Sequence, residues 1–541
     1  MTNLDYLYNP EPAKKSPVFN RKYFVDKKLS FRTIEHGMIL PPSPTGDDGK
    51  KKFLGYGGIV DKNGDYIKES FIHYETGGKY TPPAESVQRS NKTVIYLGTS
   101  WPVWGHVITD NLRRLWFLNS EYFKSFKNCP LVYIVTWSDI KQQKNFCRLL
   151  EILGVDIEKL RPITQPTQFE KIILPDESFN ILSPLSGFTA EYKESIDRVR
   201  DFALKNCTPT SSKKIYYFHD VKAQVGAERL AKYFKAKGYE IVRPERLTLD
   251  EQLNLLINCK SFASTLGSCS HNSLFLCDKT ESIFIPRNPD RFTVYQPVID
   301  ELRSLNATYI DTSLSICGNS LIGPFYYMLS EQLKRFFGDK FDGYEEEDFT
   351  NFLQYMKYSL DSGNDLNQDF VEGYGSILSD FIEQLRRRKD LLKDFGMDSF
   401  DWDKFRPKLS YQTHVAVRGW NDGWKNENQL SNPLTRKNDI QAIKINLPGY
   451  KVYYSVYYNG QEGWSEEVLS PKMAGTTGES KSVYGIKIWL DETGAKKFDI
   501  LYRVYKYDGK WTSWAKNGEI IYSHGIKLNA IQIKLETKAG I

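Results

Sequence analysis

Residues 94–116 read VIYLGTSWPVWGHVITDNLRRLW. The apolar residues 94–97 predict a buried strand, and the segment after them has helical spacing. Residues three and four apart share a face of a helix, so we expect His106, Asp110 and Arg113 on one side, just beyond the strand. An imidazole, a carboxylate and a guanidinium therefore meet where open α/β sheets bind ligands, at the carboxyl ends of their strands.

A structural role fits the same spacing. In that interpretation His106 is a satisfied surface group at the start of a helix. Asp110 and Arg114 then form an ordinary ion pair four residues apart, which stabilises a helix by only about 0.2–0.5 kcal/mol. Spacing alone leaves both interpretations open.

The composition is that of a globular protein with several domains. The chain has 541 residues, of which 40% are hydrophobic and 26% charged, and this length predicts three or four domains. The net charge of +6 comes without a long Lys/Arg block, which argues against a nucleic-acid partner. We expect no transmembrane segment, because the chain has no 18-residue apolar run.

Cysteine usage and the first residues bear on location. The seven cysteines are scattered and form no CxxC pair, which favours a reducing compartment without structural zinc. The first twenty residues are polar and lack the apolar core of a secretory signal. We therefore expect a cytoplasmic protein, either free or peripheral to the inner face of the membrane.

Strand and helix patterns alternate between about residues 91 and 318 and predict two tandem doubly wound units with parallel sheets. A hairpin is expected earlier, around Asn63-Gly64, and amphipathic helices are expected at 326–337, 347–359 and 370–392. The expected domains are a β-containing N-terminal extension packed on the rest (1–90), a first Rossmann-like domain (91–205), a second one (206–318), a helical spacer (319–407) and a β-rich repeat domain (408–541).

A second stretch with candidate chemistry is FASTLGSCSHNSLF, residues 262–275. It predicts a strand, a turn of small residues and the start of a helix, whose free N–H groups and positive dipole end attract phosphate. Gly267 allows a ligand to approach the backbone closely, and Ser268, Ser270 and His271 add donors. A plain strand–turn–helix junction capped by serines is the alternative. No G-x-G-x-x-G or Walker A motif is present, so neither a dinucleotide nor ATP is expected.

Three segments, in this order along the chain, resemble glycosyltransferase family 61 over roughly residues 55–315. They are Gly105-His106 with Asp110, Leu112 and Arg114-Leu115-Trp116, similar to G-H-x-x-x-[DE]-x-L-P-R-L-W; Pro244-Glu245 with Leu247, Thr248, Glu251 and Gln252, similar to P-E-x-L-[ST]-x-x-[ED]-Q; and Gly267 with Asn272–Phe275, similar to the end of H-G-A-x-L-T-N-x-x-F.

This resemblance implies a GT-B-like pair of Rossmann-type domains and an inverting transfer from a nucleotide sugar, with a UDP-sugar as the preferred donor. The acceptor would be a glycan or a glycoprotein, as in bacterial surface polysaccharide or capsule synthesis. No metal or other cofactor is expected. His106 and Asp110 are then the catalytic candidates, because a base with a pKa near the working pH serves best. Donor contacts are expected from Arg114, Glu245, Gly267, Ser268, Ser270, His271 and Asn272.

The chain departs from the family pattern at three places. Arg113 replaces a proline, His219-Asp220 replaces Ser-Arg, and Leu266 replaces a histidine. These departures support a second hypothesis of another class, a non-catalytic carbohydrate-binding or assembly protein with a degenerate transferase core.

A three-copy pattern follows residue 408. Each copy combines an alternating strand and a Trp with a later anchor, and the anchors begin at near-equal intervals, at Ala442, Gly485 and Ala530. Such periodicity predicts a repeat of β-strand pairs. The pattern, with AGTTG at residues 474–478, resembles the clostridial hydrophobic repeat. This resemblance implies binding of carbohydrate or of a protein partner, or self-association through the repeats.

Overall fold

The computed structural model describes residues 2–70, 77–181, 185–208, 213–219, 223–288, 292, 294–319, 322–405, 407–420, 423–435, 439–458 and 463–538. The chain divides into two compact units. The first unit comprises residues 1–315 and 320–352, and the second comprises residues 316–319 and 353–541.

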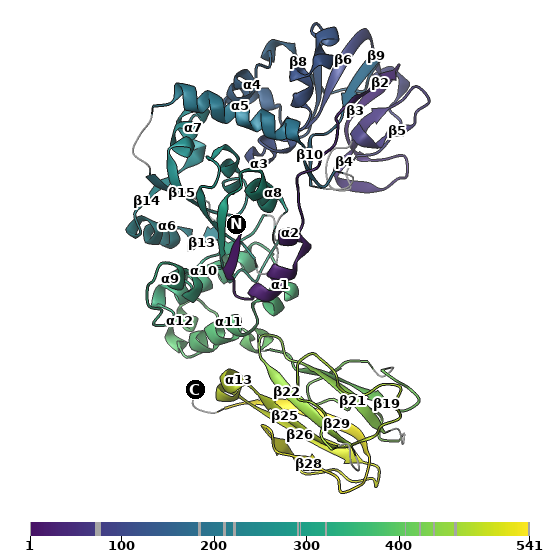
Figure 1. Ribbon diagram of the computed structural model, residues 1–541, viewed down its shortest axis with the longest axis vertical. Coiled ribbons are helices and arrows are strands. Elements are labelled where there is room, and N and C mark those ends of the chain that lie inside the picture. The colour runs from purple at the N-terminus through teal and green to yellow at the C-terminus, as the bar shows by residue number, and fades with distance from the viewer. Residues whose placement is uncertain are drawn as a thin grey trace. The chain divides into compact units, whose positions relative to one another are not determined.

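The first unit begins with an eight-stranded mixed sheet, here called the first sheet (Figure 1). Its order is β5-β4-β3-β9-β6-β7-β8, with β2 also paired to β9. β9, β6, β7 and β8 run parallel, whereas β2–β5 are antiparallel to their neighbours. The strands are β2 (Phe31–Glu35), β3 (Met38–Thr45), β4 (Lys51–Val60), β5 (Tyr66–Ile67), β6 (Gln88–Ser100), β7 (Leu131–Val135), β8 (Leu160–Ile163) and β9 (Thr167–Pro175).

The N-terminal strands belong to both sheets of this unit, which differs from the expected separate extension at residues 1–90. The hairpin around Asn63-Gly64 is confirmed, because Ile59 pairs with Ile67 across it. β2 and β3 then hydrogen-bond to β9, and β1 (Asn3–Tyr6) pairs with β17. Strand edges pair through backbone groups, which side-chain patterns do not reveal.

The second sheet consists of six parallel strands in the order β1-β17-β16-β15-β12-β14. Apart from β1, its order is that of a doubly wound sheet whose direction of strand addition reverses between β12 and β15. Such sheets bind ligands beyond the carboxyl ends of the two strands at this switch point. The strands are β12 (Lys213–Tyr217), β14 (Tyr239–Val242), β15 (Cys259–Thr265), β16 (Glu281–Ile285) and β17 (Asn306–Ile310).

Helices cover both sheets, and α5 packs against α4 and α7 (Figure 1). The capping box expected at Thr248 and Glu251 is confirmed at the start of α7. One buried apolar cluster joins residues of the first sheet, such as Ile95, to residues of the second, such as Phe262. The helices are α1 (Pro10–Lys15), α2 (Pro17–Asn20), α3 (Trp104–Val107), α4 (Lys144–Ile152), α5 (Ala190–Asn206), α6 (Ala227–Ala236), α7 (Leu249–Ile257), α8 (Tyr295–Leu302) and α9 (Glu331–Phe336).

Two expected helices differ from the structure. The helical segment after residue 104 is one short α-helix followed by 3-10 turns at Asp110–Leu112 and Leu115–Asn119. The helix expected at 326–337 begins only at Glu331, because Phe325 and Tyr326 form β18 and pair with β13 (Gln224–Val225). Tertiary pairing overrides the local helical pattern in the second case.

Helices α10 (Glu346–Asp361), α11 (Gln368–Arg386) and α12 (Lys389–Asp394) connect to the β-rich part of the second unit. The single helix expected at 370–392 is two helices, and α11 kinks at Gly375. The three-copy pattern corresponds to three antiparallel sheets around one apolar core. The main strand pairs are β19 (Ser410–Val415) with β21 (Ile440–Asn446), β22 (Val452–Tyr458) with β25 (Val483–Leu490), and β26 (Phe498–Lys506) with β29 (Leu528–Thr537).

The copies are equivalent in detail and exchange short strands. Three buried tyrosines, Tyr411, Tyr454 and Tyr502, occupy matching positions, and each hydroxyl donates to a main-chain carbonyl of the same copy. β24 (Ala474–Gly475) of the second copy pairs with β21 of the first, and β28 (Ile521–Tyr522) of the third pairs with β25 of the second. The second and third copies therefore each add a short strand to the sheet of the copy before them.

Candidate active site

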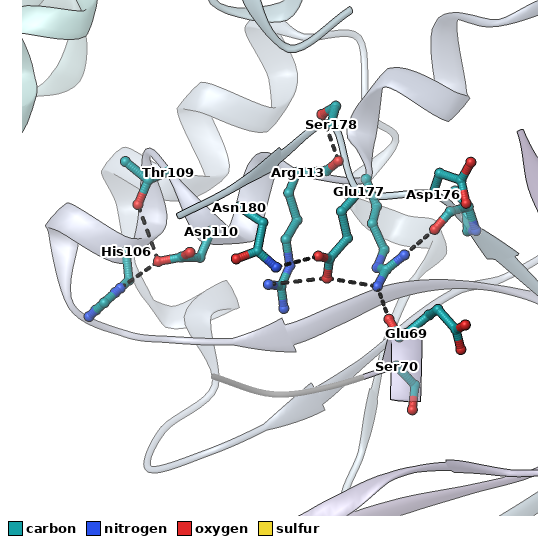
Figure 2. Close-up of polar contacts among 12 residues, drawn as sticks. Glu69, Ser70, His106, Thr109, Asp110, Arg113, Asp176, Glu177, Ser178 and Asn180 are labelled. Carbon is teal, nitrogen blue, oxygen red and sulfur yellow. Dashed lines mark hydrogen bonds and ion pairs between the residues drawn. The ribbon is translucent and has the colours of Figure 1, made fainter. Parts of the chain in front are cut away.

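His106 and Asp110 form a hydrogen-bonded pair beyond the carboxyl end of β6. Nδ1 of His106 lies 2.5 Å from Oδ2 of Asp110, and Figure 2 shows the two side chains pointing toward each other. Asp110 is buried, and the hydroxyl of Tyr295 donates to its Oδ2 at 2.9 Å. An ionised carboxylate only accepts hydrogen bonds. The proton of the imidazole therefore lies on Nδ1, which makes Nε2 the basic nitrogen.

Tyr295 reaches this pair from α8, on the side of the second sheet. Asp300 of the same helix accepts hydrogen bonds from Gln296 at 2.9 Å and from the hydroxyl of Tyr309 at 2.7 Å. Burial raises the pKa of Asp300 to about 7. The helix that carries Tyr295 is thus fixed to β17 by buried polar contacts.

The glycine turn follows β15 and contacts an arginine. Gly267 has a φ of +132°, a conformation that favours glycine, and a Cβ at this position would have to displace the guanidinium of Arg287. Arg287 follows β16, and its Cζ lies 4.9 Å from the ring centroid of Phe325. The hydroxyl of Ser270 closes the turn by donating to the Gly267 carbonyl at 2.9 Å.

The two segments singled out in the sequence are in contact. Nε1 of Trp104 donates to Oδ1 of Asn272 at 2.9 Å. A Cβ at Gly105 would lie 2.9 Å from both Nδ1 of His271 and Oγ of Ser268, which is closer than real side chains approach. Glycine at position 105 therefore lets the backbone after β6 lie directly on the turn after β15.

His271 sits inside this contact as a neutral group. Its ring is buried and lies 5.3 Å, centroid to centroid, from that of Tyr295. Burial and the neighbouring His106 lower the pKa of His271 to about 4. At neutral pH this imidazole therefore supplies hydrogen bonding but no positive charge.

A cavity of about 490 Å³ lies where the two segments meet. It lies at the carboxyl ends of β12 and β15, the switch point of the second sheet. Three predicted donor contacts, Glu245, Ser268 and Asn272, line it. The other lining residues are Pro102, Trp104, Gln143, Lys144 and Asn145 from the first half of the unit, and His219, Pro244, Gln252 and Cys269 from the second.

Of the seven predicted donor contacts, Gly267, Ser270, His271 and Arg114 are not among the residues that line the cavity, and Arg114 lies elsewhere in the unit. Its buried guanidinium donates to the main-chain carbonyls of Glu69 and Pro175 and pairs with Glu177 at 3.0 Å. Arg113 also pairs with Glu177, at 3.2 Å, instead of facing His106 as the helical spacing predicts (Figure 2). The 3-10 turns rotate both arginines away from the cavity, and the contacts of Arg114 favour a structural role.

Arg287 and Tyr295 were not identified from the sequence. Each residue lies far along the chain from the segment that it touches. The sequence spacing of the two motifs therefore could not identify Arg287 or Tyr295 as part of the site. A weak signal exists for Arg287, because it comes two residues after the apolar strand at 282–285, at the edge where doubly wound sheets bind ligands. Asp220, which replaces an arginine of the family pattern, lies outside the described residues.

The described residues contain no group of three or more His, Cys, Asp or Glu side chains placed to hold a metal ion. The helices in this described part are too short or too polar to cross a bilayer.

Residues 104–283 match the family model described as Glycosyltransferase 61, so this part of the chain is a glycosyltransferase 61 domain. The matched range contains both His106 and Gly267. A comparison with curated proteins gives no significant match. The likeness of the C-terminal copies to the clostridial hydrophobic repeat stays a prediction.

Proposed function

We propose that the chain is an inverting glycosyltransferase that moves a sugar from a nucleotide sugar to a glycan or protein acceptor. The supporting observation is that Trp104, two residues before His106, and Ser268, next to Gly267, line one cavity within a glycosyltransferase 61 domain. A volume of about 490 Å³ is typical of small-ligand sites. The two sheets would act as the halves of a GT-B-like pair.

His106 is the proposed base. Its Nε2 takes the proton of the acceptor hydroxyl while that oxygen attacks C1 of the donor sugar, on the face opposite the nucleotide. The bond between C1 and the phosphate oxygen breaks, and its electron pair leaves with the nucleoside diphosphate, so the configuration at C1 inverts. Asp110 is a positioning residue, because it holds the Nδ1 proton and stabilises the imidazolium that forms.

The departing diphosphate needs positive charge and hydrogen-bond donors. Arg287 lies against the Gly267 turn, and a guanidinium binds phosphate oxygens in a fork geometry. Ser268 and Lys144 line the same cavity and add a hydroxyl and an ammonium group. Glu245, which also lines the cavity, can accept hydrogen bonds from ribose hydroxyls. Preorganised groups of this kind stabilise a leaving group without reorganisation.

The wider setting follows from the family resemblance. We propose a UDP-sugar as the donor and a reaction that requires no metal. The pathway would be bacterial surface polysaccharide or glycoconjugate synthesis, in the cytoplasm or at the inner face of the membrane. The three-copy β-rich part would bind the acceptor or a protein partner.

The test is release of nucleotide from UDP-, GDP-, CMP- and dTDP-sugars. The proposal predicts turnover of at least one donor by the wild type and its loss in His106→Ala. His36→Ala serves as the matched control, because His36 is an exposed histidine in the same unit. If no donor is turned over and none shifts the thermal unfolding of the wild type, the non-catalytic alternative takes the place of this proposal.

A further inference from the structure

The exposed indole of Trp137 is linked to His106 through ring contacts with Trp101. Trp137 follows β7 at the carboxyl edge of the first sheet, and 62% of its surface is exposed. Its ring meets that of Trp101 edge to face at 5.4 Å, and the Trp101 ring lies 5.7 Å from the imidazole of His106. Trp101 itself is 2% exposed. An exposed indole offers a flat apolar face with a polar N–H at its edge, which suits packing against a sugar ring.

The backbone on both sides of Trp137 is fixed to the loop after β6. The hydroxyl of Thr136 donates to the carbonyl of Ser100 at 2.8 Å. Nε2 of Gln143 donates to the carbonyl of Pro102 at 2.6 Å. A platform held in this way loses little conformational freedom when a ligand binds.

We propose that Trp137 is an acceptor subsite, on which one sugar of an oligosaccharide stacks while the next sugar presents its hydroxyl to His106. The apolar face of a pyranose packs on an indole, and the hydroxyl groups at its rim stay in water. The Trp101 ring contacts both Trp137 and His106, and the proposal assigns Trp137 and His106 to two neighbouring sugars. The preferred acceptor is therefore a glycan of two or more sugars. This inference rests on the proposed transferase function.

The experiment separates transfer to an acceptor from hydrolysis of the donor. Wild type, Trp137→Ala and Trp137→Phe are incubated with the same UDP-, GDP-, CMP- and dTDP-sugars, alone or with methyl glycosides, cellobiose, xylobiose or chitobiose. Tyr122→Ala is the matched control, because it removes a partly exposed aromatic ring from the same unit. Saturation-transfer NMR with the same disaccharides measures acceptor binding independently of turnover.

We expect Trp137→Ala to hydrolyse the donor at the wild-type rate and to lose about tenfold in transfer to a disaccharide, which corresponds to about 1.4 kcal/mol. The preference of Trp137→Ala for disaccharides over methyl glycosides disappears. The transfer rate of Trp137→Phe lies between those of wild type and Trp137→Ala, and Tyr122→Ala behaves as wild type. Unchanged transfer in Trp137→Ala, or an equal fall in transfer and hydrolysis, overturns the inference. If the wild type turns over no donor, the transferase proposal fails, and the NMR decides separately. Saturation-transfer signals from the disaccharides that appear with wild type and are lost with Trp137→Ala then support the subsite. Equal signals with both proteins, or no signal with the wild type, overturn it.

Discussion

The indole N–H of Trp104 donates a hydrogen bond to the side-chain oxygen of Asn272 at 2.9 Å. These residues lie 168 positions apart in the chain, one after β6 of the first sheet and the other after β15 of the second. Asn272 also donates to the carbonyl of Cys269 at 3.0 Å, so its amide orientation is fixed. This bond brings the His106 segment and the Gly267 turn to one cavity.

Asn272→Ala removes the acceptor of this bond and leaves the indole N–H of Trp104 without its partner. Loss of one hydrogen bond costs about 0.5–1.5 kcal/mol, so we expect the free energy of unfolding of the first unit to fall by that amount. Denaturant unfolding measures it. Asn119→Ala, at an exposed asparagine of the same unit, is expected to stay within about 0.5 kcal/mol of wild type, and an equal effect of both variants would contradict this account.

Asp110→Asn tests whether the carboxylate sets the tautomer of His106. An amide can donate a hydrogen bond to Nδ1, which moves the proton of the imidazole to Nε2 and removes the base. We expect kcat to fall by about 10³-fold or more, with the donor KM little changed. Steady-state kinetics with the best donor measures both constants. Retention of more than a tenth of the wild-type kcat would exclude Asp110 from this role.

Asp300 predicts a pH dependence of stability. Burial raises its pKa to about 7 in the folded chain, from the ordinary value of 3.8. Between these values the folded state holds a proton that the unfolded state has lost. The contribution of Asp300 to stability is therefore complete below about pH 4 and is lost as the pH rises to about 7, at roughly 1.4 kcal/mol per pH unit.

Asp300→Asn removes this titration. The difference in unfolding free energy between wild type and variant should move in favour of the variant from pH 4 to pH 7, as measured by denaturant unfolding at each pH. A difference that is constant over this range would show that Asp300 keeps an ordinary pKa.

The three matching tyrosines of the second unit predict equal effects. Tyr411, Tyr454 and Tyr502 each donate to a carbonyl within their own copy, so replacement of any one by Phe should cost about 0.5–1.5 kcal/mol. The unfolding transition of the second unit measures each cost. Equal costs support three equivalent copies, whereas a large cost at one position and none at the others would show that the copies are not energetically equivalent.

The sequence predicted features that depend on neighbours along the chain. The spacing of His106 and Asp110, four positions apart, places them in contact even though the helix is not continuous. The turn at Gly267 and the capping box of α7 could also be predicted, because each depends on a few neighbouring residues. The three β-rich copies follow from periodicity alone.

Features that depend on distant segments were not predictable. Arg287 and Tyr295 reach the site through the order of strands in the second sheet, which no local pattern specifies. Arg114 was predicted as a donor contact because its motif position suggested it, but its guanidinium is buried against Glu177 and two carbonyls. The N-terminal strands were assigned to an extension because edge pairing depends on backbone groups of β9 and β17.

The central claim is that a nucleotide sugar binds in the cavity beside the Gly267 turn, with Arg287 at its diphosphate. Calorimetric titration of UDP-, GDP-, CMP- and dTDP-sugars into wild type and Gly267→Ala tests it most directly, because the added methyl group would displace the guanidinium. We predict that at least one donor binds the wild type and that its affinity falls at least tenfold in the variant while the fold is retained. Equal affinity in both proteins, or no binding of any donor to the wild type, would contradict the account.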